Sequence, residues 1–337
     1  MWDSRPKPLR HEAREGLLSG APAGENRYAA STGRWPIPGG SRPANIGGIK
    51  GGRARPALGA PGRAAAPILT RSARAPALPL HTGAMQTFRK HRHRAPDGFF
   101  AVEAAGLNWL ASARAVKVAS VISVDADSIV LERLPTASPT PSHARDFGRA
   151  LAAMHDAGAA AFGSPPDGWA GDGFIGDAPL PLRPEPSWGA FYSRHRVLPY
   201  ADGAHHRGAL TLEQYRPLTA LCARLERGDF DDPAPPARIH GDLWSGNVMW
   251  TPSGAALIDP AAHGGHRITD LAMLALFAVP YLNEILDAYA RASDHLPTDW
   301  RALIPLHQVH PLLVHAMLFG GGYGAQAARA ASAALTL

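Results

Sequence analysis

The chain has 337 residues, carries a formal net charge of +6 and contains one cysteine, Cys222. A single cysteine excludes a disulfide within the chain, and a hydrophobic content of 45% is typical of a globular protein with a sizeable core. The charge is uneven, because residues 1–84 hold 13 basic and 4 acidic residues. The chain has no run of 18 apolar residues and no apolar signal-peptide core, so we expect a cytoplasmic protein without a membrane partner.

Residues 1–84 are rich in Ala, Gly, Pro, Arg and Ser and contain few large apolar residues. Such a segment cannot bury enough apolar surface to offset its conformational entropy, so we expect a disordered N-terminal arm. A basic arm can bind nucleic acid. This one lacks interleaved aromatic residues and an RNA-binding signature, which argues against a nucleic acid partner.

The segment 85–134 contains the first regular elements that the pattern predicts. A helix is expected from residue 99 to 107, and two strands are expected at Val116–Val124 and Ser128–Leu131, separated by a turn. A linker rich in Pro, Ser and Thr, residues 135–142, then separates this segment from the rest of the chain.

The remainder of the chain is predicted to be mainly helical. Phe147, Leu151, Met154 and His155 fall on one face of a helix predicted over 143–157, so we expect His155 to be a core residue. Cys222 lies in another apolar helical pattern and is expected to be a buried thiol. Further helices are predicted at 210–227, 271–277, 281–292, 300–310 and 312–319, with a tail at 326–337.

The stretch from 239 to 277 carries the polar residues that suggest chemistry. Two short apolar runs, 248–250 and 255–258, flank a turn containing Pro and Gly, which predicts a β-hairpin with Trp250 opposite Ala255. In that register Asn247 faces Ile258. Asn247 and Asp259 then emerge side by side at the open end of the hairpin.

An amide oxygen and a carboxylate on adjacent strand ends suit a hard cation such as Mg²⁺. Asp242, five residues before Asn247, could orient a substrate hydroxyl beside that metal. Kinases arrange phosphoryl transfer in this way. The alternative is a surface hairpin flanked by ordinary polar residues, which the second carboxylate at Asp259 disfavours.

Three motifs carry a family resemblance: H-G-D-L-W-S-G-N from residue 240, I-D-P-A from 258 and G-H-R-x-x-D-L-A-M from 265. They resemble the fructosamine kinase (ketosamine-3-kinase) family, within the aminoglycoside phosphotransferase and choline kinase group of protein-kinase-like folds. The resemblance covers about residues 86–325. It implies an α+β fold of two lobes, 85–134 and a helical 135–325. It also implies Asp242 as catalytic base and Asn247 and Asp259 as Mg²⁺ ligands.

The same resemblance assigns nucleotide-binding roles in the first lobe. Lys90 would hold the α- and β-phosphates of ATP, and Glu103 would pair with Lys90. Glu132 and Leu134 would lie at the hinge, whose backbone would hydrogen-bond adenine. Four residues are expected near the acceptor substrate, namely Trp244, His266, Arg267 and Asp270. Arg267 and Asp270 are also expected to pair with each other or to brace the loop.

The sequence departs from the family before residue 85, where no segment reads as the first strands and the loop over the phosphates. We therefore expect a truncated or incomplete N-terminal β-lobe. A misassigned start or an upstream frame error would produce such a sequence.

The resemblance implies a monomeric enzyme that uses ATP and Mg²⁺ to phosphorylate a sugar hydroxyl of a ketoamine, either fructosamine or ribulosamine. The phosphorylated adduct is unstable and releases the amine, so the reaction would deglycate proteins or small amines. Two alternatives remain open. One is a small-molecule phosphotransferase resembling aminoglycoside or choline kinases, and the other is an inactive chain without a complete ATP lobe.

Overall fold

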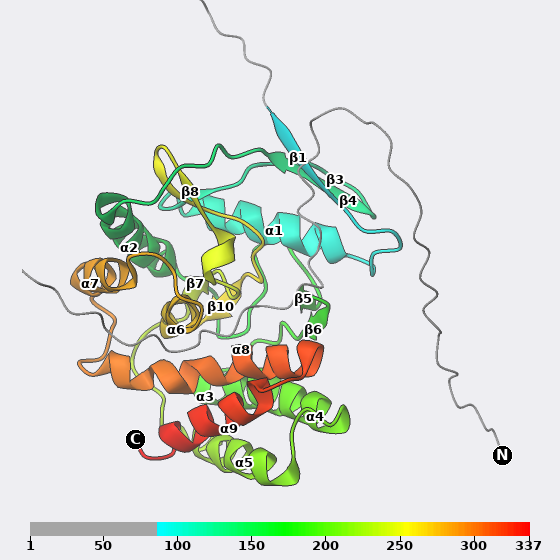
Figure 1. Cartoon of the computed structure of the whole chain (residues 1–337), viewed down its shortest axis with the longest axis vertical. Helices are drawn as coiled ribbons and strands as arrows, with labels where there is room; N and C mark the ends of the chain where they lie inside the picture. Colours follow the sequence, from blue (N-terminus) through cyan, green and yellow to red (C-terminus); the bar gives the residue numbers. More distant parts are fainter. Residues whose placement is uncertain (1–85) are drawn as a thin grey trace, which may run out of the picture. The chain divides into compact units, whose positions relative to one another are not determined.

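The computed structural model describes residues 86–337. The arm expected to be disordered, residues 1–84, lies outside the described residues. The described chain forms a small lobe of strands with one helix and a larger, mainly helical lobe (Figure 1). The small lobe contains one antiparallel sheet in the order β1–β4–β3, with helix α1 packed against β3 and β4. These elements are β1 (Thr87–His91), α1 (Phe99–Ser112), β3 (Val121–Val124) and β4 (Ser128–Glu132).

The single strand predicted at Val116–Val124 is wrong, because the chain changes sheet within it. Its first part, β2 (Lys117–Val118), pairs in parallel with β9 (Gly254–Leu257) of the predicted hairpin. The Ala119 amide continues this pairing by donating to the Leu257 carbonyl oxygen at 3.0 Å. The second part, β3, then returns to the sheet of the small lobe. A continuous β pattern in the sequence cannot reveal which partner each half will choose.

The predicted hairpin is confirmed in position and in register. Strand β8 (Val248–Thr251) pairs with β9, and Trp250 lies opposite Ala255. Beyond the last paired residues, the Ile258 amide donates to the Asn247 carbonyl oxygen at 3.2 Å. The register therefore extends to the open end of the hairpin, where the predicted site residues lie.

The large lobe begins with helix α2 (Pro141–Asp156), close to its predicted position. The Thr140 hydroxyl accepts a hydrogen bond from the His143 amide at 3.1 Å, and Pro141 occupies the first turn. The other helices are α3 (Trp188–Tyr192), η1 (Ser193–Val197), α4 (Leu198–His206), α5 (Leu212–Glu226), η2 (Ser245–Asn247), α6 (Ile268–Leu276) and α7 (Leu282–Ala292). The other strands form the pairs β5 (Gly173–Ile175) with β6 (Ala178–Leu180) and β7 (Ala237–Ile239) with β10 (His263–Gly265).

The last part of the lobe contains η3 (Trp300–Leu303), α8 (Ile304–Phe319) and α9 (Tyr323–Ala334). The two helices predicted on either side of Pro311 are one helix, because α8 runs through Pro311 without ending. By length and composition alone, the stretch Trp300–Phe319 is apolar enough to cross a membrane. Half of it is buried inside the fold, as expected of a core helix, and it packs against α4, α6 and α9.

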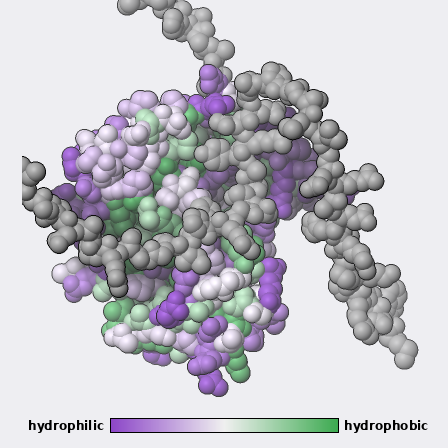
Figure 2. Space-filling view, in the orientation of Figure 1, coloured by the Kyte–Doolittle hydropathy of each residue, from purple (hydrophilic) through white to green (hydrophobic). Residues whose placement is uncertain are grey.

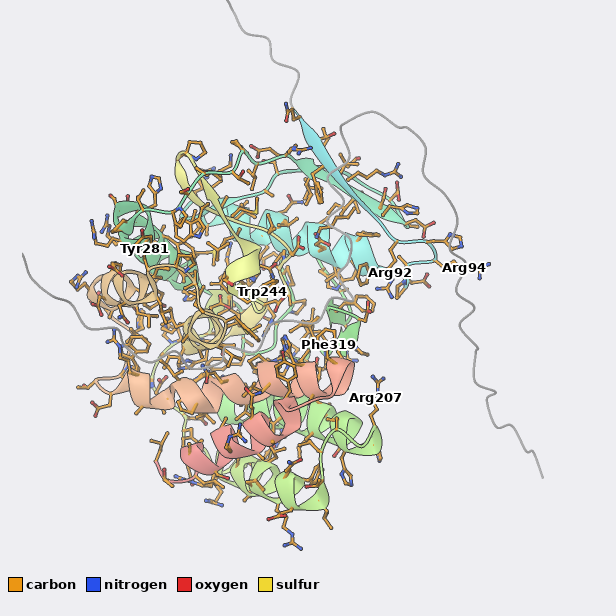
Figure 3. All side chains as sticks on the ribbon, viewed as in Figure 1. Arg92, Arg94, Arg207, Trp244, Tyr281 and Phe319 are labelled. Atoms are coloured by element: carbon orange, nitrogen blue, oxygen red, sulfur yellow. The ribbon has the colours of Figure 1, made fainter. Side chains whose placement is uncertain are left out.

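The visible face of the large lobe mixes hydrophobic and hydrophilic residues (Figure 2). Within residues 86–337, the exposed large apolar side chains are few: Ile122, Val124, Leu212, Tyr281, Phe319 and Leu337. Tyr281 and Phe319 lie well apart in Figure 3, so they do not form one patch on this face. The buried apolar residues form two main clusters, one joining α1, α2, α7 and the hairpin and the other joining α3, α4, α5, α8 and α9.

Candidate active site

The loop that carries Asp242 is held by its backbone. Gly241 has a φ of 80°, and a Cβ at this position would lie 2.2 Å from the Ala261 carbonyl oxygen, so only glycine fits. The amides of His240 and Gly241 both donate to the Asp270 carboxylate, at 2.7 and 2.9 Å. The loop therefore has a fixed backbone conformation immediately before Asp242.

Asp242 and Asn247 are joined by hydrogen bonds across the loop. The Asn247 amide nitrogen donates to the Asp242 carboxylate at 3.0 Å and to the Asp242 carbonyl oxygen at 2.8 Å. Burial, and then the nearby Asp259 carboxylate, raise the pKa of Asp242 to about 8. Two carboxylates in a site of low polarity repel one another, so the site favours a cation.

Asp259 lies beside Asn247, as the hairpin register predicts. The Asn247 amide nitrogen is 3.4 Å from the Asp259 carbonyl oxygen. Asp259 has a φ of 55°, in the left-handed region that few residues other than glycine adopt. Its carboxylate hydrogen-bonds the Lys90 ammonium group and is 40% exposed. The side-by-side placement is thus confirmed, whereas a shared metal remains a prediction.

Lys90 joins the small lobe to this site. It lies on β1, and its Nζ is 2.6 Å from the Glu103 carboxylate on α1, so the predicted ion pair forms. Burial alone would lower the pKa of Lys90, but the carboxylates of Asp259 and Glu103 outweigh burial and raise it. Lys90 is therefore a cation held between two carboxylates, one from each lobe.

The expected hinge lies at the end of β4. The Glu132 carboxylate contacts the Lys117 ammonium group at 2.9 Å, and the Glu132 amide donates to the Ser120 carbonyl oxygen. Because this amide is occupied, the Glu132 backbone could bond adenine only by accepting a hydrogen bond at its carbonyl oxygen. Leu134 is buried in a small apolar cluster with Ala119 and Ala256, with Met249 and Ile258 packed against it. This cluster places an apolar surface between the hinge and the catalytic hairpin.

A family model described as fructosamine kinase matches residues 73–336. The chain belongs to the fructosamine kinase family. A probable ketoamine kinase from Thermus thermophilus is 34% identical over 271 residues, which cover 77% of this chain and 95% of the relative.

Solved structures agree with this assignment. A protein from Thermobifida fusca, provisionally named fructosamine-3-kinase, aligns with a TM-score of 0.69 at 47% identity over 74% of this chain and 86% of that chain. A protein from Haemophilus somnus with the same provisional name aligns at 20% identity with a TM-score of 0.62, covering 73% and 82% of the two chains, and supports the fold alone. This member of the fructosamine kinase family therefore has the predicted α+β, protein-kinase-like fold and is a phosphotransferase.

Replacing Lys90 with alanine is expected to weaken nucleotide binding by this kinase about 10- to 100-fold, since a hydrogen bond to a charged group contributes roughly 1.5–3 kcal/mol. Titration with ATP and Mg²⁺ measures the effect. Arg149→Ala is the control, because Arg149 is exposed on α2 and its ion pair with Asp146 is more than half exposed. Equal affinities for the two variants would remove Lys90 from the nucleotide site.

Three of the four residues expected near the acceptor are buried in the fold, so their contact with substrate stays a prediction, whereas Asp270 braces the loop as expected. His266 is 4% exposed and bonds the Asp232 carboxylate at 3.1 Å, and Arg267 is 1% exposed and bonds Asp156 at 2.6 Å. Asp270 is fully buried beneath the loop. Trp244 is the member of this group that is only partly buried, so it remains a candidate for substrate contact (Figure 3). Its ring contacts Phe277, with the two ring centroids 6.4 Å apart.

Asp270 instead belongs to a buried polar network that supports the loop. His155 is fully buried, as predicted, and its Nε2 lies 3.1 Å from the Asp270 carboxylate. The other ring nitrogen of His155 lies 2.7 Å from the Tyr289 hydroxyl on α7. The helical face of α2 predicts burial of His155, but no local pattern indicates its partners 115 and 134 residues away.

Replacing Asp270 with alanine is expected to destabilise the fold by about 3–5 kcal/mol, because it leaves two buried amides and a buried histidine without their partner. Urea unfolding measures the change. Asp287→Ala is the control, since its ion pair with Arg301 is about half exposed and such pairs contribute roughly 0–1 kcal/mol. If Asp270→Ala and Asp287→Ala lose the same free energy of unfolding, Asp270 does not support the loop.

Proposed function

We propose that this protein is a kinase that uses ATP and Mg²⁺ to phosphorylate a sugar hydroxyl of a ketoamine. The observation that carries the proposal is the cluster in which Lys90 contacts Asp259, beside the hydrogen-bonded pair of Asp242 and Asn247. It brings together a phosphate-binding cation, two oxygen ligands and a carboxylate next to them. Family membership supports the ketoamine as the acceptor.

The residues present fit a magnesium ion. Asn247 and Asp259 supply oxygen atoms, and the raised pKa of Asp242 beside Asp259 indicates negative charge that a cation would relieve. Mg²⁺ is usually held by one or two carboxylates together with phosphates and water. When bound, Mg²⁺ neutralises charge on the phosphates.

The protein's own groups then have distinct tasks. Asp242 accepts a hydrogen bond from the acceptor hydroxyl, orients it and takes its proton late in the transfer. Lys90 binds the phosphates in place of the Asp259 carboxylate. Asp270 keeps the loop in place by holding two amides. The phosphorylated ketoamine would then break down and release the amine, which is the deglycation reaction.

A panel of acceptors tests the proposal. The full chain is incubated with ATP and Mg²⁺ and, separately, a fructosyl-amine, a ribulosyl-amine, an aminoglycoside and choline, and phosphoryl transfer is followed by ³¹P NMR. We expect transfer to a ketoamine, with loss of transfer in EDTA. Preference for the aminoglycoside or choline would favour the small-molecule kinase alternative. Failure to bind ATP in a direct titration would favour an inactive chain.

A further inference from the structure

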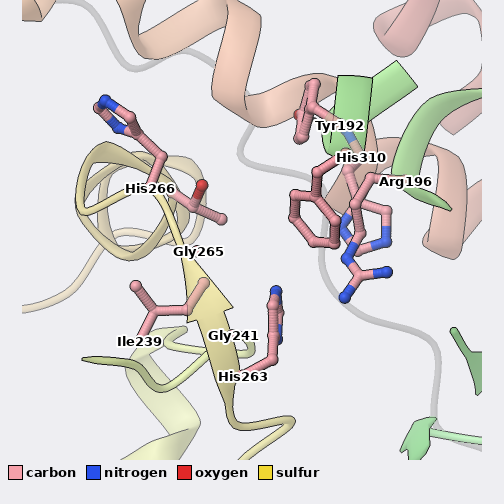
Figure 4. A pocket seen from close by; sticks show the side chains of 10 residues that line it. Tyr192, Arg196, Ile239, Gly241, His263, Gly265, His266 and His310 are labelled. Carbon is pink, nitrogen blue, oxygen red and sulfur yellow. Dashed lines mark hydrogen bonds between the residues drawn. The ribbon is translucent and has the colours of Figure 1, made fainter. Parts of the chain in front are cut away.

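A small cavity lies beside the catalytic loop, where η1, β10 and α8 meet. Arg196, His263, His310 and Tyr192 line it together with Gly241 (Figure 4). Its volume is about 10 Å³, which is room for a single species the size of a water molecule. The proposed phosphoryl transfer uses none of these side chains.

Arg196 is a buried cation in this wall. Its side chain is 1% exposed, and its Nη1 donates to the carbonyl oxygens of Pro181 and His195 at 2.9 and 2.8 Å. The guanidinium group also lies 4.5 Å from the centre of the Phe191 ring. Among the described residues, its Nε and Nη2 atoms are buried and have no hydrogen-bond partner. Two nitrogen atoms of the arginine, which carry three N–H donors, are therefore unsatisfied.

The charge of Arg196 has no counter-charge in contact with it. Among the described residues no carboxylate forms an ion pair with it, and the Asp172 carboxylate acts on it only weakly from farther away. Burial lowers the pKa of Arg196 to about 10, so the group remains a cation at neutral pH. Buried charges are normally paired, since an isolated charge in a medium of low polarity is costly.

His263 and His310, in the same wall, are neutral, and His310 offers a further hydrogen-bond donor. Burial, and then the charge of Arg196, lower the pKa of His263 to about 3 and that of His310 well below its ordinary value, so both rings are neutral near pH 7. His263 donates from Nδ1 to the Ala261 carbonyl oxygen at 2.7 Å. Among the described residues the Nε2 atom of His310 has no hydrogen-bond partner; it is buried and can carry the ring's proton. Figure 4 shows the His310 ring next to the Arg196 guanidinium group.

We propose that this cavity is a binding site for one monatomic anion, a halide such as chloride. The free N–H groups of Arg196 and the Nε2–H of His310 would donate to it. A halide is somewhat larger than a water molecule and needs a small outward shift of the walls, whereas a phosphate or carboxylate group needs a much larger one. A water molecule would satisfy the donors but would leave the arginine without a counter-charge in contact with it. Because η1, β10, α8 and Gly241 all border the cavity, a bound halide would stabilise their packing.

Thermal unfolding of the full chain tests the proposal. The midpoint is measured in potassium gluconate and then with chloride or bromide substituted at constant ionic strength. We expect the midpoint to rise by roughly 5 to 10 °C at a halide concentration 100 times the Kd. The variant Arg196→Met should lose this rise. Arg207→Met should keep it, because Arg207 is exposed and donates only to the Met317 carbonyl oxygen among the described contacts.

Crystals of the unmodified protein grown in bromide give a second readout that does not depend on folding of the Arg196 variant. An anomalous scattering peak in the cavity, next to Arg196, supports the site. A cavity with water and no anomalous peak, or equal midpoints in halide and gluconate, overturns it. Neither readout involves phosphoryl transfer, so failure here is distinct from failure of the proposed kinase activity.

Discussion

Asp242→Asn is expected to lower kcat for ketoamine phosphorylation about 10²–10⁴-fold, the usual contribution of a general base. The substitution removes the proton acceptor but retains a side-chain oxygen that can accept the hydrogen bond from Asn247. Because Lys90, Asn247 and Asp259 are unchanged, the Kd for ATP with Mg²⁺ should change less than about threefold. A change of this size is well below 1.4 kcal/mol of binding free energy, which would be tenfold. Steady-state phosphorylation of a fructosyl-amine and a separate nucleotide titration measure the two quantities.

Asp146→Asn is a suitable control, since Asp146 is an exposed residue of α2 that pairs with Arg149. A parallel loss of nucleotide binding and rate in Asp242→Asn would make Asp242 a metal ligand or a structural residue. If neither quantity changes, the catalytic assignment of the whole stretch from 239 to 277 is incorrect.

Acidification is expected to destabilise the fold steeply below pH 6.5. Six histidines of the described chain have a pKa lowered by burial: His155, His240, His263, His307, His310 and His315. In the unfolded chain each takes up a proton near its ordinary pKa of about 6.5, so below this pH the unfolded state binds more protons. The free energy of unfolding is therefore highest above pH 6.5 and falls as the pH is lowered. Each histidine lowers it by up to about 1.4 kcal/mol per pH unit.

The raised pKa values of Asp242 and Glu103 act in the opposite direction, but six histidines outnumber these two carboxyl groups, so we expect a net loss of stability between pH 6.5 and 5. Urea midpoints at pH 7.5, 6.5 and 5.5 measure the slope. His307→Gln removes one buried site and should flatten the slope, whereas His206→Gln, at an exposed position, should leave it unchanged. A midpoint that is constant from pH 7.5 to 5.5 would contradict the expectation.

The hairpin and its site residues could be predicted because the determinants are local. A turn with Pro and Gly fixes the register of the two short strands that flank it, so Asn247 and Asp259 had to meet. The pairing of Lys90 with Glu103 came from family resemblance, since the two residues lie on separate elements. The contact of Lys90 with Asp259, which is 169 residues away, depends on how the two lobes pack.

The residues around the acceptor could be placed only in part from the sequence, because sequence proximity to the loop does not imply access to it. His266, Arg267 and Asp270 follow the predicted metal ligands in the chain, and tertiary packing buries all three, which fits the expected bracing role of Asp270. Asp270 in particular acts through backbone amides 29 and 30 residues earlier in the sequence. The partner of each buried polar group is set by helices that the local pattern cannot position.

The parallel pairing of β2 with β9 bears on how the two lobes can move. The chain of the small lobe is bonded to the hairpin that carries Asn247, so the two lobes share main-chain hydrogen bonds as well as a covalent connection. An opening motion must either break these bonds or pivot around them. Since main-chain bonds resist stretching more than side-chain packing does, the axis of rotation should run through β2, with the largest displacement at β1 and at the amino-terminal end of α1. Substrate entry would then be controlled at the edge of the small lobe farthest from β2.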